Sequence, residues 1–254
     1  MPEGDTIAWA AHRIRPVLQG RVPDEILTPQ PRHELDRWPQ RLAGRVLESV
    51  ETHGKHLFLC FEGELLIHSH LGMTGAWFVA RERRPWRRAW IILRVGDRWV
   101  VERDGPLLEL ITEGRRRFDQ RLAALGPDVL APEFDAARFL TRLRGDDPTR
   151  GLGDALLDQR NLAGIGNIWK AEGCWEAQLD PWRPLSRVSD EELVALIEAI
   201  RPRMLSSANE GPRRIQPRIY RRAGQPCLRC GVRISADRQG DANRTTYWCP
   251  GCQR

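Results

Sequence analysis

Four cysteines near the end of the chain limit what that region can fold into. They form two Cys-x2-Cys pairs, Cys227/Cys230 and Cys249/Cys252, with eighteen residues between the pairs. Each pair can present two thiolates on one turn, and two such turns close over a tetrahedral zinc ion. A module of about 30 residues is too small to fold on its apolar core alone and needs its metal. The spacing therefore predicts a β-hairpin zinc ribbon that binds one structural Zn²⁺.

The charge balance fits a polyanionic partner. The 254 residues carry a net charge of +6 and a pI of about 9.4, and 38 of the 40 basic residues are arginines. Arginine suits bidentate phosphate contacts and the reading of base edges, although coding bias in a GC-rich genome produces the same excess. No apolar run approaches the roughly 18 residues of a membrane span, and the acidic N-terminus is unlike a signal peptide. We therefore expect a cytoplasmic protein without a membrane partner.

The first half of the chain predicts a helix followed by a β-sandwich. Apolar residues recur at helical spacing from Thr6 to Leu18, and Pro16 is expected to kink or shorten this helix. Short segments rich in β-forming residues follow, separated by glycine-containing turns. They are Arg45–Val50, Leu57–Phe61, Leu65–His68, Trp77–Val79, Ile91–Val95 and Trp99–Val101. Many short strands at this spacing favour a two-layer sandwich.

The second half predicts helices. Candidates are Phe134–Arg144, Leu152–Gln159 and Ile168–Ala177, the last two joined by a glycine-rich turn that ends in Gly166 and Asn167. We expect Asn167 to be the N-cap of the third helix, with backbone N–H groups directed at a phosphate. Helix pairs with such a turn bind nucleic acids, although any helical hairpin can contain one.

The remaining segments complete the domain organisation. A capping box at Ser189 predicts a helix that runs through Leu205, and residues 207–224 resemble a basic linker. The expected fold class is α+β and multidomain. The domains are an N-terminal helix plus β-sandwich over residues 1–125, a helical domain over 126–220 and the zinc ribbon over 221–254.

The first residues offer an unusual nucleophile. If Met1 is removed, Pro2 becomes the N-terminus, and its secondary amine has a pKa of about 8, well below the 10.4 of lysine. Such an amine can attack an aldehyde-level carbon, and Glu3 beside it can transfer protons. Taken alone, Pro-Glu is more often an ordinary frayed terminus.

Two turns carry further candidates. Lys55 follows Gly54 at a strand start or hairpin tip, where it is either a ligand for an anion or a solvated turn residue. Leu71 and Met73 lie on a loop bracketed by glycines. They can enter a DNA stack as wedges, or they can simply pack in the core at a strand end.

These features, in this order, resemble the bacterial formamidopyrimidine-DNA glycosylase/endonuclease VIII family. The match covers essentially the whole length. It consists of Pro2-Glu3-Gly4, Gly54-Lys55-His56-Leu57-Phe58-Leu59, the run from Leu156-Leu157-Asp158-Gln159 to Gly164-Ile165-Gly166-Asn167, and the ending Tyr247-Trp248-Cys249-Pro250-x-Cys252-Gln253. The opening residues resemble those of actinobacterial members of the endonuclease VIII branch, and the helical region resembles their helix–two-turn–helix.

The resemblance implies roles for these residues. Pro2 resembles the nucleophile that attacks the sugar C1′ of an everted nucleotide and forms a Schiff base, and Glu3 the group that protonates the sugar ring oxygen. Lys55 and Asn167 resemble the residues that hold the phosphates around the lesion. Arg244, at the tip of the zinc ribbon, resembles the arginine that holds phosphates and assists δ-elimination. Four more candidates for DNA contact are Leu71, Met73, Gly166 and Arg88, the last of which ends a charged, proline-containing loop.

The chain also departs from the family pattern. Formamidopyrimidine-type members carry an Arg-x-Phe intercalating loop after the sandwich, and the corresponding stretch 104–109 lacks it. That absence favours the endonuclease VIII side, although the His-Leu-Gly-Met loop is closer to the formamidopyrimidine type. Thr6 stands where many relatives have Glu, and Arg221 where a Gly before the zinc finger is usual.

The sequence therefore predicts a monomeric DNA glycosylase with apurinic/apyrimidinic (AP) lyase activity on damaged DNA in a bacterial nucleoid. Oxidised bases, with pyrimidines favoured, are the expected substrates. Two alternatives stay open. One is an AP lyase that removes few bases, and the other is a non-catalytic zinc-ribbon protein that binds DNA.

Overall fold

The computed structural model describes residues 2–254, apart from the side chains of Arg32 and Glu34. It divides the chain into two units, the first ending at Ala123 and the second spanning Ala124–Arg254. No helix in the described part of the chain has the length and apolar character to cross a bilayer.

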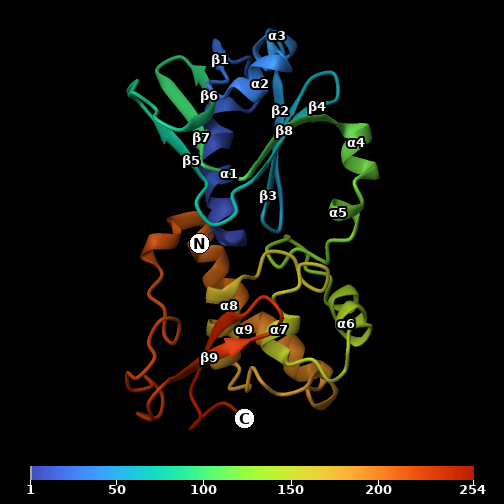
Figure 1. Cartoon of the computed structure of the whole chain (residues 1–254), viewed down its shortest axis with the longest axis vertical. Helices are drawn as coiled ribbons and strands as arrows, with labels where there is room; N and C mark the ends of the chain where they lie inside the picture. Colours follow the sequence, from blue (N-terminus) through green and yellow to red (C-terminus); the bar gives the residue numbers. More distant parts are fainter. Residues whose placement is uncertain (1) are drawn as a thin grey trace. The chain divides into compact units, whose positions relative to one another are not determined.

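The first unit is organised around helix α1 (Gly4–Leu18). Its apolar stripe, which includes Ile7, Ala11 and Ile14, is fully buried. Pro16 lies in the last turn, and the helix continues to Leu18, so the expected shortening at Pro16 does not occur. The helix lies between two β-sheets and packs against both (Figure 1).

Each sheet has four antiparallel strands, so the predicted two-layer sandwich is confirmed. One sheet has the order β1 (Glu25–Leu27), β6 (Ala89–Val95), β7 (Arg98–Arg103) and β5 (Ala76–Ala80). The other has the order β2 (Leu47–His53), β3 (His56–Phe61), β4 (Leu65–His70) and β8 (Leu107–Thr112). The main core cluster lies between the sheets.

Several elements were not expected from the sequence. Strand β8 occupies Leu107–Thr112, although its first residues belong to the stretch that we had compared with an intercalating loop. Short helices also complete the first unit. They are α2 (Pro31–Leu35), α3 (Trp38–Leu42), α4 (Glu113–Phe118) and α5 (Gln120–Ala123).

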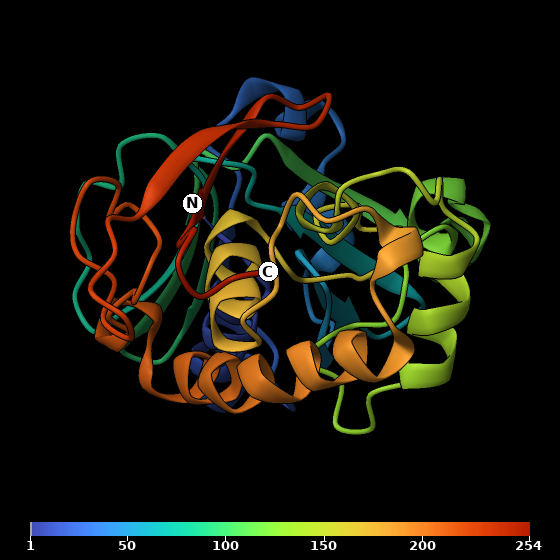
Figure 2. The ribbon, with the colours of Figure 1, turned by 90° about the horizontal axis from the view of Figure 1, so that it is seen from below.

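The second unit is helical and ends in the predicted β-hairpin. Its helices are α6 (Ala136–Arg144), α7 (Leu152–Ala155), α8 (Asn167–Glu176) and α9 (Asp190–Glu210), with short 3₁₀ turns η1 (Leu185–Arg187) and η2 (Pro212–Arg214). Strands β9 (Ser235–Gln239) and β10 (Arg244–Trp248) form the hairpin. Helix α8 lies between α9 and this hairpin (Figure 2).

The capping box that was predicted at Ser189 is present. The Ser189 side chain accepts from the backbone of Glu192, and the Glu192 carboxylate accepts from the backbone of Ser189. Helix α9 continues past the predicted end at Leu205 to Glu210.

The segment that we expected to be a basic linker is anchored rather than free. Backbone N–H groups of Arg218, Ile219 and Tyr220 donate to the carboxylate of Glu172 at 2.9–3.1 Å. Glu172 is fully buried on α8 and also accepts from Arg203 at 3.0 Å. A buried carboxylate thus fixes the chain before it enters the zinc ribbon.

Candidate functional site

The candidate nucleophile and its neighbour lie at the start of α1. Glu3 precedes the helix in extended backbone geometry, and its carbonyl accepts from Thr6 and Ile7 at 3.0 and 3.2 Å. Its side chain is 1% exposed, whereas Pro2 is half-buried. The predicted removal of Met1 lies outside the described residues. A rigid helix start therefore fixes a buried carboxyl group next to the proline.

Lys55 lies on the tight β2–β3 hairpin. His53 pairs with His56, so Gly54 and Lys55 form a two-residue loop, in which Gly54 has a φ of 57° that glycine adopts without strain. Burial first, and then the charge of Lys55, lower the pKa of His70. Lys55 is therefore close to His70 and only partly exposed, which differs from a freely solvated turn lysine.

A hydrogen-bonded histidine chain, which we did not expect from the sequence, begins beside Lys55. His56 Nδ1 lies 2.8 Å from His68 Nε2, and His68 Nδ1 lies 3.0 Å from Glu109 Oε1. Because a carboxylate only accepts, His68 donates through Nδ1, and neutral His68 then accepts from His56. This assignment leaves Nε2 of His56 as an acceptor.

The environment keeps these imidazoles neutral. Burial, followed by the charges of His70 and His68, lowers the pKa of His56 to about 3. Burial also lowers the pKa of His68, against the opposing effect of Glu109. The side-chain alternation of β4 and its register with β3 and β8 could have indicated this cluster, because they place His70 opposite His56 and Glu109 opposite His68.

The two wedge candidates occupy different environments. Leu71 is 2% exposed and belongs to the core cluster of the first unit, while Met73 is 66% exposed. Gly72 between them has a φ of 55°, and a Cβ at this position would lie 2.5 Å from Pro106. Only Met73 presents its side chain at the surface, so the wedge reading of Leu71 does not fit this structure.

In the second unit, α8 and the ribbon bring together Asn167 and Arg244. Asn167 is the first residue of α8, and Gly166 is the N-cap, so the N-cap role that we expected for Asn167 is wrong. The Asn167 amide instead donates to the carbonyl of Thr245 at 2.8 Å. Its Oδ1 is buried and makes no hydrogen bond within the described part of the chain. The contact with Thr245 places Asn167 next to Arg244, which begins β10.

A buried polar network holds the ribbon against the helices. Lys170 on α8 is fully buried and donates to the Thr246 hydroxyl at 2.6 Å. Thr246 donates to Gln239 at 2.7 Å, and Gln239 donates to the carbonyl of Pro181 at 2.7 Å. Sequence reasoning assigned no role to Lys170, because lysines are rarely buried.

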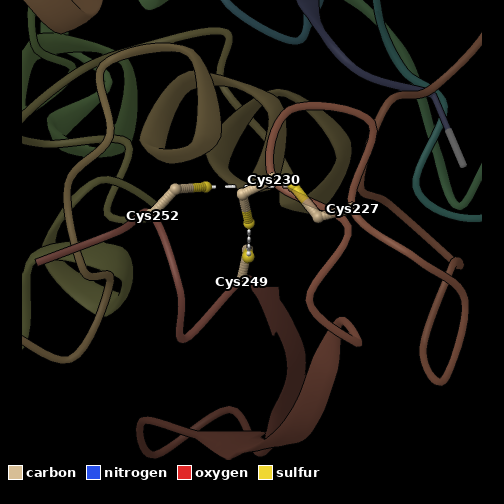
Figure 3. Close-up of side chains that lie close together, drawn as sticks. All are labelled: Cys227, Cys230, Cys249 and Cys252. Atoms are coloured by element: carbon tan, nitrogen blue, oxygen red, sulfur yellow. Dashed lines mark hydrogen bonds between the residues drawn. The ribbon is translucent and has the colours of Figure 1, made fainter.

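The four predicted zinc ligands converge at the base of the ribbon (Figure 3). Their sulfur atoms all lie within 4.8 Å of one another, with 3.8 Å between Cys227 and Cys252 and 3.4 Å between Cys230 and Cys249. A tetrahedral site with Zn–S bonds of about 2.3 Å requires sulfur separations of about 3.8 Å. The four thiols therefore fit one structural zinc ion.

The surroundings of Cys227 favour the thiolate that zinc binds. Burial opposes ionisation, but hydrogen bonds from the Trp175 indole and the backbone of Arg229 and Cys230 outweigh it and lower the Cys227 pKa to about 6. The Trp175 Nε1 lies 3.3 Å from the Cys227 sulfur.

Arg88 lies in the first unit, 75% exposed and paired with Asp104 at 2.7 Å. It ends the loop between β5 and β6, which belongs to the sheet opposite the one that carries Lys55.

Comparisons with known proteins cover the whole chain. The formamidopyrimidine-DNA glycosylase N-terminal domain matches residues 1–119, the formamidopyrimidine-DNA glycosylase H2TH domain matches residues 125–216, and the zinc finger found in FPG and IleRS matches residues 224–254. A probable endonuclease 8 2 of Streptomyces coelicolor is 40% identical over 100% of this chain and 94% of its own length. The DNA-(apurinic or apyrimidinic site) lyase Nei2 of Mycolicibacterium smegmatis is 34% identical over 100% and 99% of the two chains.

Solved structures share the fold. The Lactococcus lactis Fpg (MutM) in complex with DNA that contains N7-benzyl-Fapy-dG superposes with a TM-score of 0.85 at 22% identity over 100% of both chains. MutM in complex with DNA that contains carbocyclic 8-oxo-G has a TM-score of 0.84 at 23% identity, again over 100% of both chains.

Proposed function

The chain belongs to the formamidopyrimidine-DNA glycosylase/endonuclease VIII family, and we propose that it is a base-excision-repair DNA glycosylase with AP lyase activity. The observation that carries this proposal is the Pro2-Glu3 pair at the start of a buried helix, in a chain that matches all three family segments in order.

Pro2 is the proposed nucleophile. With Met1 removed, its unprotonated amine attacks the sugar C1′ of the damaged nucleotide, a bond to C1′ forms, and the base leaves with the electron pair of the glycosidic bond. The amine loses its N–H proton, the ring oxygen gains a proton and the bond between C1′ and the ring oxygen breaks, which gives a positively charged iminium. The iminium draws electrons from the neighbouring C2′–H bond, the Glu3 carboxylate takes the C2′ proton, and the 3′ phosphate leaves by β-elimination. Glu3, buried beside the amine, is the proposed acid that protonates the ring oxygen.

Phosphate contacts offset the cost of taking the nucleotide out of the stack, which is a few kcal/mol. We propose Lys55, Asn167 and Arg244 for these contacts, with Gly166 at the positive N-terminus of α8. The Asn167 amide donates one N–H to the carbonyl of Thr245 at 2.8 Å, and its second N–H is the proposed donor to a phosphate oxygen. Met73, exposed on the glycine-bracketed loop, is the proposed wedge that fills the space of the everted base.

Oxidised pyrimidines are the proposed substrates, and a monomer acting on damaged DNA is the proposed working form. The pyrimidine preference rests on the similarity to endonuclease 8 proteins and on the absent Arg-x-Phe motif. An AP lyase that removes few bases is the second candidate. One relative, which matches this chain over 99% of its own length, is named a DNA-(apurinic or apyrimidinic site) lyase.

The test compares strand cleavage of an abasic duplex with base release from duplexes that contain an oxidised pyrimidine or an oxidised purine. We expect cleavage of the abasic duplex and faster release of the pyrimidine. Arg244→Ala is expected to slow base release more than cleavage of the ready-made abasic site, because phosphate clamping supports eversion. Equal losses on both substrates would refute that role, and binding without any cleavage would favour the non-catalytic alternative.

A further inference from the structure

The β5–β6 connection crosses the outer face of the first unit's sheet. Strands β5 and β6 both run antiparallel to β7, so they point in the same direction and the chain must return along the sheet between them. Ala80 at the end of β5 pairs with Trp99 at one end of β7, and Ala89 at the start of β6 pairs with Arg103 at the other end. Residues 81–88 therefore pass over β7 on the side facing away from the main core.

This crossing segment covers a small apolar cluster of its own. Trp86 packs against Ala89, Ile92, Trp99 and Val101, which form a cluster separate from the core between the sheets. The segment and the outer face of the sheet form a cavity of about 420 Å³ that is open to solvent. It is lined by Leu27, Arg83, Arg84, Pro85, Trp86, Ile92 and Trp99. The floor of the cavity is thus aromatic and aliphatic, and its rim is cationic.

The rim is strongly charged. Residues 81–88 contain five arginines and one glutamate, and all of these side chains are exposed. Arg88 is held by Asp104 at 2.7 Å. The Arg83 guanidinium lies over the Trp99 ring, 5.8 Å from its centroid. The Trp86 Nε1 is buried and makes no hydrogen bond within the described residues.

We propose that this cavity binds an unpaired nucleobase of a single-stranded nucleic acid, with the adjoining phosphates on Arg83, Arg84 and Arg87. Every base has a flat face that stacks on an aromatic ring, and cationic side chains beside the ring follow the backbone of an unpaired strand. Bases inside a duplex are stacked on each other, so their faces are closed to such a cavity.

The cavity is distinct from the proposed catalytic residues. Lys55 belongs to the opposite sheet, and the main core cluster lies between that sheet and β7. The inference does not rest on the chemistry of Pro2, because single-strand binding is measured without a lesion and without catalysis.

The first test measures the binding of a fluorescein-labelled oligothymidylate of about 12 nucleotides to the full chain by anisotropy, at several salt concentrations. We expect Arg83→Ala/Arg84→Ala to bind about tenfold more weakly, with a salt slope smaller by about 1.4, since each phosphate contact on a single strand contributes about 0.7. The matched control, Arg21→Ala/Arg41→Ala, removes two exposed arginines elsewhere in the same unit and is expected to change the affinity less than twofold. Equal weakening by both pairs would overturn the proposal, because it would show a general effect of charge.

The second test addresses stacking. Trp86→Ala is expected to weaken binding about tenfold or more, whereas Trp86→Phe, which keeps an aromatic face, should stay within about threefold of the original protein. Photo-crosslinking of the unaltered protein to the same oligonucleotide carrying 5-iododeoxyuridine is independent of any folding defect in the variants. We expect a crosslink within residues 81–99. Crosslinks found only outside this segment, or folded Trp86→Ala protein with unchanged affinity, would overturn the proposal.

Discussion

Glu172 offers a measurable link between a buried charge and the placement of the zinc ribbon. Its carboxylate is fully buried and accepts from three consecutive backbone N–H groups, those of Arg218, Ile219 and Tyr220, and from the guanidinium of Arg203. In Glu172→Gln the shape of the side chain is retained, but the charge is lost and an NH₂ group faces donors that need an acceptor.

The expected cost follows from these contacts. A hydrogen bond to a charged group contributes about 1.5–3 kcal/mol, against about 1 kcal/mol for a neutral one, and a donor left unsatisfied costs a further 1–3 kcal/mol. The weaker hydrogen bonds and one unsatisfied donor together lower the free energy of unfolding of Glu172→Gln by about 3 kcal/mol. For a unit of about 130 residues the entropy of unfolding is about 0.27 kcal/mol per degree, so the Tm should fall by about 10 °C.

Scanning calorimetry checks this value, with Glu210→Gln as the matched control. Glu210 is in the same unit, at the end of α9, and is 56% exposed, and its ion pair with Arg214 spans 3.9 Å. The same chemical change there should shift the Tm by less than about 2 °C, because exposed ion pairs contribute about 0–1 kcal/mol. Chelator-induced zinc release should be faster in Glu172→Gln only, since the anchored segment precedes Cys227. Indistinguishable melting of the two variants would refute the reasoning.

Two further predictions concern the first unit. The pKa of His56 is lowered from 6.5 to about 3, so the unfolded chain takes up a proton at this residue at a higher pH than the folded chain does. The contribution of this group to stability is complete above about pH 6.5 and is lost as the pH falls toward 3. Urea unfolding should show about 3 kcal/mol less stability at pH 4.5 than at pH 7.5 from this group, and His56→Gln should flatten that dependence. An unchanged slope would contradict the assignment. Met73→Ala should reduce base release with little effect on stability, whereas Leu71→Ala should destabilise the fold by about 2–5 kcal/mol because it opens a cavity in the core; the reverse pattern would exclude Met73 as the wedge.

Features encoded by local spacing were predictable from the sequence. The apolar period of α1 and the capping box before α9 act within a few residues of chain, and the spacing of the two Cys-x2-Cys pairs identifies the four zinc ligands. The short strands were also recognised, because β-forming residues alternate with glycine turns.

Features that depend on pairing between distant segments were missed. Strand β8 follows Gly105-Pro106 and is stabilised by its register with β4, which no local pattern reports. The residue type of Asn167 suits an N-cap, but its amide reaches the carbonyl of Thr245, 78 positions away.

Arg221 has a φ of 60°, a conformation that favours glycine, and this agrees with the expectation that a glycine is usual there.

The buried charged groups were missed for a related reason. Lys170 and Glu172 are two residues apart on α8, and both are fully buried. Composition and periodicity place such side chains at the surface, because burial of a charge is costly without partners. Their partners, Thr246 and the backbone of residues 218–220, come from segments far along the chain.

The most direct test of the central claim is borohydride reduction of the enzyme in the presence of abasic DNA, followed by digestion and mass spectrometry. We expect one stable adduct on the peptide that starts at Pro2, with Met1 absent, and a large loss of adduct in Pro2→Gly. An adduct on Lys55 or on another residue, or Pro2→Gly protein that is trapped as well as the unaltered chain, would contradict the proposal that the N-terminal amine performs the chemistry.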